Sequence, residues 1–171
     1  MRTSRILPVL LTVVAIVAIP ALAAGASANA PKMRGFEEVP ALSNPAGGSF
    51  ISVISASEDA IEYELTYKNT ESDVTQAHLH MAQKGVNGGI TVFLCSNLGN
   101  GPAGTQACPA RNGTIHGTIH ASDVLAVNAQ GIGAGELFSV IRGIKLGIVY
   151  ANVHSVQFPG GEVRGQLVFK P

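Results

Sequence analysis

The strongest constraint on the fold is a two-residue alternation of apolar and polar side chains at residues 61–68. The apolar positions are Ile61, Tyr63, Leu65 and Tyr67, and polar or charged residues stand between them. Such alternation indicates an antiparallel strand with one buried face and one solvated face. Further segments of strand-forming residues lie between Gly-, Pro- and Asn-containing turns. They predict a short strand at 35–39 and longer strands at 50–56, 75–82, 90–95, 112–120, 148–156 and 162–169.

One segment follows a different period. Leu137, Val140, Ile141 and Ile144 are spaced as the apolar face of a short helix, and Gly147 is placed to end it. Many short strands with a single helix indicate an all-β fold, an antiparallel β-sandwich or barrel.

The first thirty residues have the order of a secretory signal. Arg2 and Arg5 precede an apolar segment at 6–19, and small residues follow up to Ala30. We expect residues 1–30 to be a signal peptide, cut at a position between 23 and 30, and residues 31–171 to form a single domain. The alternative is an uncleaved anchor, since residues 6–24 approach the length that crosses a bilayer.

Charge and hydropathy narrow the location and the partners. The formal net charge is zero, so the basic face that nucleic-acid binding requires is not indicated. No second apolar stretch of spanning length follows the first, so no membrane span is expected after signal cleavage. We expect a protein of the cell envelope, secreted, extracellular or periplasmic, whose partner is a protein or a cell-surface ligand.

The two cysteines are expected to form a disulfide. Export favours oxidation, and Cys95 and Cys108 enclose a Gly- and Pro-rich loop that such a bond would tie. A redox or metal-binding pair is disfavoured, because neither the CxxC spacing nor a neighbouring ligand cluster is present.

The histidines are the candidate functional residues. His78 and His80 share one face of their predicted strand, and His154 lies on the face of another strand that also carries Asn152. A five-residue turn at 157–161 would pair His154 with Arg164 across the last hairpin, and Asn152 with Gln166. The resulting polar stripe on one sheet face would consist of Asn152, His154, Glu162, Arg164 and Gln166.

Two hypotheses account for His78, His80 and His154. In the first, these residues form a hydrogen-bonded polar cluster that fixes strand register, and the protein needs no cofactor. In the second, they bind copper or zinc, because alternate histidines on a strand reach one ion and a third can complete a trigonal set. His116 and His120 share a face with threonines on another strand and are expected to be exposed.

Catalytic arrangements are poorly supported, and we expect a non-enzymatic protein. The sequence has no nucleophile elbow, zinc-protease helix, phosphate loop or dinucleotide fingerprint. Glu37 and Glu38 point to opposite sides of an extended segment, which makes them a poor acid/base couple. A metal-dependent redox enzyme resembling copper/zinc dismutases is the remaining enzymatic alternative, although it needs more ligands than five dispersed histidines supply. For a binding module, Phe36 and Phe158 are candidate contact residues in loops.

Three blocks of the sequence resemble the chordin-type (CHRD) domain family, in the order in which that family shows them. The first is Glu38-Val-Pro followed by Ala46-Gly-Gly48, and the second is Ala77-His-Leu-His80 followed by Gly85-Val-Asn-Gly88. The third is Tyr150-Ala-Asn-Val-His-Ser155 followed by Pro159-Gly-Gly-Glu-Val-Arg-Gly-Gln-Leu167.

The resemblance implies an all-β extracellular domain that covers residues 35–169. In chordin, such domains belong to a secreted growth-factor antagonist, and in microbial proteins they often stand alone after a signal peptide. The segment from Cys95 to Cys108 departs from the family pattern. The family's shared residues map onto His78, His80, Asn152, His154, Glu162, Arg164 and Gln166.

Overall fold

A computed structural model describes residues 25–171, so the greater part of the predicted signal peptide lies outside the described residues. The described chain contains nine strands and one α-helix. Their bounds are β1 (Ala26–Arg34), β2 (Gly47–Ile54), β3 (Ile61–Lys68), β4 (Val74–Met81), β5 (Gly89–Ser96), β6 (Gly113–Ile119), α1 (Leu137–Lys145), β7 (Val149–Ser155), β8 (Val163–Gln166) and β9 (Val168–Lys170).

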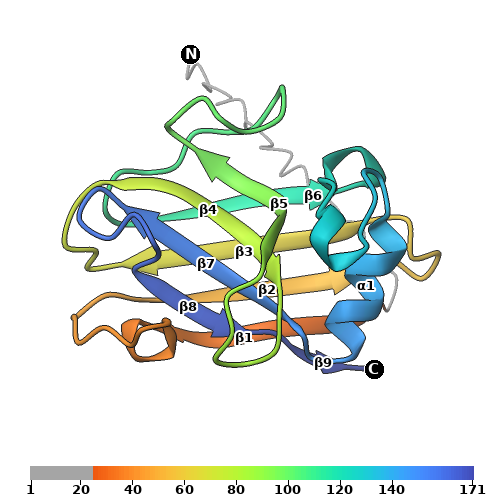
Figure 1. The fold of residues 1–171 in the computed structure, drawn as a ribbon, viewed down its shortest axis with the longest axis horizontal. Coiled ribbons are helices and arrows are strands. Elements are labelled where there is room, and N and C mark those ends of the chain that lie inside the picture. Colours follow the sequence, from red (N-terminus) through yellow and green to blue (C-terminus); the bar gives the residue numbers. More distant parts are fainter. Residues whose placement is uncertain (1–24) are drawn as a thin grey trace, which may run out of the picture.

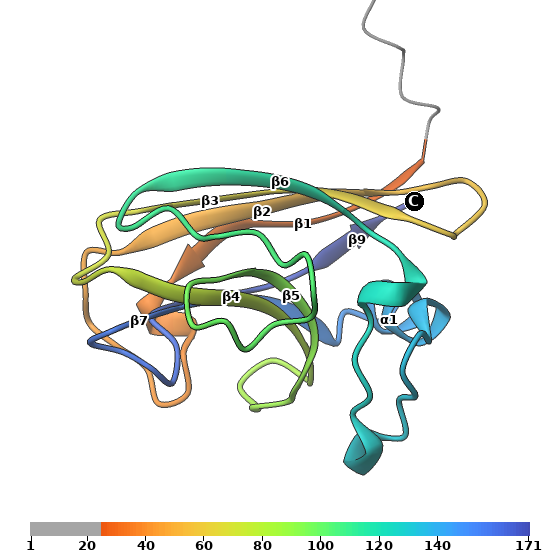
Figure 2. The same cartoon turned by 90° about the horizontal axis from the view of Figure 1, so that it is seen from above.

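The strands form an antiparallel sheet in the order β5-β4-β7-β8-β1-β2-β3-β6, with β9 paired to β1. The sheet folds over on itself, so that β4, β5 and β7 form one layer and β1, β2, β3 and β6 the other (Figures 1 and 2). Across the open side, the Tyr63 hydroxyl donates to the Leu94 carbonyl, 3.1 Å away. The fold is therefore a sandwich close to a closed barrel, which confirms the predicted all-β class.

The core lies between the two layers and follows the alternation read from the sequence. Ile61, Leu65 and Tyr67 of β3 are fully buried, as are Leu79 of β4 and Val153 of β7. Side chains at the intervening positions of β4 and β7 point out of the core, to the opposite face of their layer. His78, His80 and His154 stand on that outer face.

The predicted helix and disulfide are both present. Leu137, Val140 and Ile144 of α1 are buried, and Gly147 follows the helix with a φ of 69°, a left-handed conformation that glycine adopts without strain. Cys95 and Cys108 are disulfide-bonded, with their Cα atoms 5.1 Å apart. Within residues 25–171, no helix has the length and apolar character needed to cross a bilayer.

Two predicted strands differ from the structure. Residues Gly35–Glu37 form a 3-10 turn, and the strand in this part of the chain is β1, which ends at Arg34. The last predicted strand is divided at Leu167 into β8, which pairs with both β7 and β1, and β9, which pairs with β1.

Candidate functional site

The polar residues on the outer face of β4, β7 and β8 are buried although they lie outside the core. Three loops cover them, and we call these the cover loops: residues 35–46 between β1 and β2, 82–88 between β4 and β5, and 156–162 between β7 and β8. The loops lie on the side of the β4–β7 layer that faces away from β3 and β6, and residues 35–46 reach that side from β1 and β2 (Figure 2). Beneath them, His78 is 0% exposed, and His80 and His154 are each 6% exposed.

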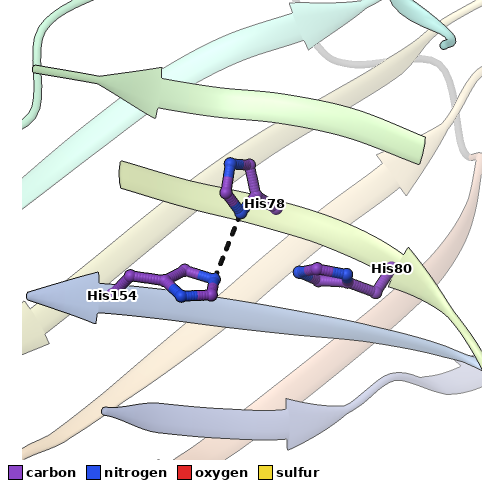
Figure 3. A group of neighbouring side chains, drawn as sticks. All are labelled: His78, His80 and His154. Atoms are coloured by element: carbon purple, nitrogen blue, oxygen red, sulfur yellow. Dashed lines mark hydrogen bonds between the residues drawn. The ribbon is translucent and has the colours of Figure 1, made fainter. Parts of the chain in front are cut away.

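The three histidines form one cluster (Figure 3). The Nδ1 of His78 lies 3.2 Å from the Nε2 of His154. One ring nitrogen from each residue lies within 4.8 Å of the other two, and the outer end of the His80 ring points toward the other rings. The structure therefore brings together the three residues that the sequence singled out as one candidate metal site.

Backbone carbonyls of the cover loops fix the tautomers of two rings. His80 donates from Nδ1 to the Gly88 carbonyl at 3.0 Å, and His154 donates from Nδ1 to the Pro159 carbonyl at 3.0 Å. Each ring must then present the unprotonated Nε2, with its lone pair, on the opposite side. This is the orientation that carbonyl or carboxylate partners impose on metal-binding histidines.

Burial keeps all three rings uncharged. Loss of solvation lowers the pKa of His78 to about 2, aided by repulsion from His154 and His80. Burial likewise lowers the pKa of His80 to about 4 and also lowers the pKa of His154. Neutral imidazoles are the form that binds metal ions.

Arg164 holds the second cover loop in place. Its guanidinium, 2% exposed, donates to the Val86 carbonyl at 2.6 Å and to Oδ1 of Asn87 at 3.1 Å. It also stacks on the ring of Tyr150, 3.4 Å from the centroid, and Tyr150 in turn stacks on His80. A planar, delocalised cation suits this combination of stacking and forked hydrogen bonding.

Two carboxyl groups complete the cluster. Glu38 of the first cover loop accepts a hydrogen bond from Nδ2 of Asn152 at 2.6 Å, and burial raises its pKa to about 7. Glu162 is fully buried and accepts the backbone N–H of Glu71 at 2.7 Å. The third cover loop thus carries an acid into the same buried environment.

Sequence reasoning assigned the register of the last hairpin wrongly. Asn152 lies opposite Arg164, and Tyr150 opposite Gln166. The turn is longer than predicted, because the backbone of 155–161 bonds to itself around Phe158 and the ladder resumes only where Glu162 donates to the Val153 carbonyl. A shift by two residues keeps side-chain parity, so the stripe stays on its predicted face.

The remaining candidates lie elsewhere. Gln166, at the end of β8, donates to the carbonyls of Ala82 and Gly147 rather than to the histidines. His116 and His120 are exposed, as predicted. Phe36 is 64% exposed, whereas Phe158 is half-buried.

Three members of the cluster were not identified as site residues from their chemistry. Glu38 was interpreted only as half of an unsuitable acid pair, although it opens the first family block. Tyr150 shares a strand face with His154, and this shared face is the sequence feature that could have identified Tyr150 as a member of the cluster. Phe93, whose ring meets His78 edge-on at 4.3 Å, comes from β5 and could be placed only once the pairing of β4 and β5 was known.

Comparison with known proteins gives one match. A family model described as the CHRD domain matches residues 31–167. Neither curated proteins nor solved structures gave a match.

Proposed function

Because the chain belongs to the CHRD domain family, a family of extracellular-type, non-enzymatic modules, we propose that it is an exported, non-enzymatic binding module of the cell envelope or extracellular space. Its partner is a protein or a cell-surface ligand, and its contact surface is formed by the three cover loops. A nucleic-acid partner is not proposed, because the formal net charge of the chain is zero and such binding requires an excess of positive charge.

The observation that carries the proposal is the way the buried cluster fixes the cover loops. Each loop is tied to the sheet by a cluster side chain: residues 35–46 through Glu38, residues 82–88 through Arg164, and residues 156–162 through His154. Binding residues commonly sit on loops that a rigid scaffold positions. The cluster therefore supports a preorganised surface rather than flexible connections.

Exposed apolar side chains at the loop surface support the same function. Phe36 and Val86 are 64% and 48% exposed, in loops joined by a Lys84–Glu37 ion pair of 3.0 Å and by the hydrogen bond from Asn87 to the Val39 carbonyl. Apolar residues gathered on neighbouring loops with a polar surround are typical of interaction sites. The disulfide fits an oxidising location outside the cytoplasm.

The test is binding of the exported protein, fluorescently labelled after purification, to intact host cells and isolated envelope. We expect saturable binding that a Phe36→Ser/Val86→Ser variant weakens about tenfold or more. Phe138→Ser is the matched control, because Phe138 is 68% exposed and belongs to α1, at the other end of the molecule from loop 35–46 (Figure 1). Equal binding by both variants and the original protein, or no saturable binding, would contradict the proposal.

A further inference from the structure

The histidine cluster has a feature that loop anchoring does not require. Nε2 of His80 is buried and makes no hydrogen bond within the described chain, and the same is true of Nε2 of His78. A buried polar nitrogen without a partner costs free energy, about 1–3 kcal/mol by mutational measures. The bond from His80 Nδ1 to the Gly88 carbonyl anchors the loop but leaves this cost at Nε2, and a ligand bound at Nε2 would remove it.

The separation of the rings suits a shared metal ion. Two nitrogen ligands, each about 2.0–2.1 Å from one ion, lie about 3.3–3.6 Å apart in tetrahedral or trigonal geometry. His78 Nδ1 and His154 Nε2 are 3.2 Å apart, close to that value. The third nitrogen, from His80, lies within 4.8 Å of the other two.

The outer contacts are also those of a metal centre. The carbonyls of Gly88 and Pro159 accept the Nδ1–H groups of His80 and His154, which leaves both Nε2 lone pairs directed inward. Phe93 and Tyr150 pack against His78 and His80 and restrict access of water. A rigid, dry set of three neutral nitrogens results.

The number of ligands separates copper from zinc. No fourth histidine, cysteine or carboxylate joins these three rings in the part of the chain that the structure describes. Structural zinc sites are almost always four-coordinate, and catalytic ones fill the fourth position with water. A three-nitrogen site with little solvent access instead suits trigonal copper, and monovalent copper in particular accepts three ligands.

The surrounding charges favour the same ion. Within residues 25–171, the buried charged residues other than the histidines are Glu38, Glu162 and Arg164. Because burial raises the pKa of Glu38 to about 7, these groups carry at most one net negative charge at neutral pH, so a divalent cation would leave more uncompensated charge than a monovalent one. An uncompensated buried charge is strongly unfavourable.

We propose that His78 Nδ1, His80 Nε2 and His154 Nε2 bind one copper(I) ion. The two carbonyl-bonded rings bind without any change of tautomer. His78 gives up the Nδ1 proton that it shares with His154 and carries it on Nε2 instead, so no net proton is released and copper keeps its oxidation state. The site lies beneath the cover loops and shares their anchoring bonds to Gly88 and Pro159, but copper(I) binding there does not require a macromolecular partner at the loop surface.

The experiment is an anaerobic titration of the exported protein with copper(I), in ascorbate, against a chromophoric copper(I) chelator. We expect one copper(I) per chain, three nitrogen ligands by X-ray absorption, and no displacement by an equal concentration of zinc(II). His80→Ala should lose the site. His116→Ala/His120→Ala, which removes two exposed histidines, should keep it.

Further measurements remain decisive if His80→Ala folds poorly. Copper(I), but not zinc(II), should raise the melting temperature of the unmodified protein, because a ligand that binds only the folded state stabilises it. His80→Gln, which keeps a polar side chain of similar size, provides a second variant for the titration. No copper(I) uptake by the unmodified protein, uptake that survives in a folded position-80 variant, or tighter binding of zinc(II) would overturn the proposal.

Discussion

Nδ1 of His78 lies 3.2 Å from Nε2 of His154, although the two residues are 76 positions apart in the chain. β4 and β7 pair side by side, and this pairing places both rings on the outer face of the sheet beneath the cover loops. The contact joins two strands and, through His154 and Pro159, a loop. Protonation of these rings should therefore affect the whole covered face.

The first prediction concerns acid stability of the metal-free protein. Burial lowers the folded-state pKa of all three histidines below the ordinary value of 6.5, to about 4 for His80 and about 2 for His78. Their contribution to the free energy of unfolding is fully present above pH 6.5. It is lost as the pH falls toward 4, by up to about 1.4 kcal/mol per pH unit for each ring. The melting temperature should fall steeply over this range.

Glu38 opposes this effect and supplies the control. Burial raises the pKa of Glu38 in the folded protein to about 7. The contribution of Glu38 to the free energy of unfolding is therefore fully present below pH 4.5, its ordinary pKa, and is lost as the pH rises through 7. Glu38→Gln should therefore make the acid loss steeper. A melting temperature that is flat between pH 6.5 and 4 in the original protein would contradict the buried neutral state of the histidines.

The second prediction concerns Arg164. Arg164→Met keeps the aliphatic stem but removes the donors to Val86 and Asn87 and leaves buried Glu38 without the positive charge that lowers its pKa. We expect a loss of about 3 kcal/mol in the free energy of unfolding by urea, together with faster amide exchange in loop 82–88. Arg142→Met, at an exposed position of α1, should change the free energy by no more than about 0.5 kcal/mol. Equal effects of the two substitutions would show that Arg164 does not hold the loop.

The third prediction concerns the disulfide. Cys95 and Cys108 are 13 positions apart, and a bond closing a loop of that size contributes about 3 kcal/mol on the chain-entropy estimate. Cys95→Ala/Cys108→Ala should lower the free energy of unfolding by about that amount, and reductant should not lower it further. Alanine is preferred to serine because both positions are buried. An unchanged free energy in the double variant would mean that the loop is ordered without the bond.

The fourth prediction concerns the mature N-terminus. β1 begins at Ala26, and Ala28 and Ala30 are buried between β2 and β9. A cut after Ala30 would remove half of this strand, whereas a cut after Ala23 leaves it whole. We therefore expect mass spectrometry of the exported protein to give a chain that starts at residue 24. A chain that starts at Pro31 would contradict this expectation.

Local sequence patterns predicted the strands and the helix better than they predicted how these elements pair and pack. Residues 61–68 and the apolar spacing at 137–144 were sufficient for β3 and α1, because both elements bury one face against a single core. Parity also placed the histidines on a common side of their strands. The register of β7 and β8 was not predictable, because the hydrogen bonds of the intervening turn decide it.

The burial of the site could not be predicted either. A polar stripe on an outer sheet face is ordinarily solvated, and only the tertiary fold shows that three loops close over it. Glu38 illustrates the difficulty: adjacent to Glu37 in the sequence, it is buried against Asn152, while Glu37 pairs with Lys84 at the surface. Contacts of this kind between distant segments leave no local pattern.

The most direct test of the copper centre is the metal content of the protein as the host makes it. The protein is purified from the exported fraction without chelator or affinity tag and analysed by elemental mass spectrometry, beside a His78→Ala/His80→Ala variant and a His116→Ala/His120→Ala control. We expect near-stoichiometric copper in the original protein and the control, and none in the folded variant. A protein that contains no copper and takes up none, with histidines whose loss only lowers the melting temperature, would contradict the account and make the cluster a purely structural anchor for the cover loops.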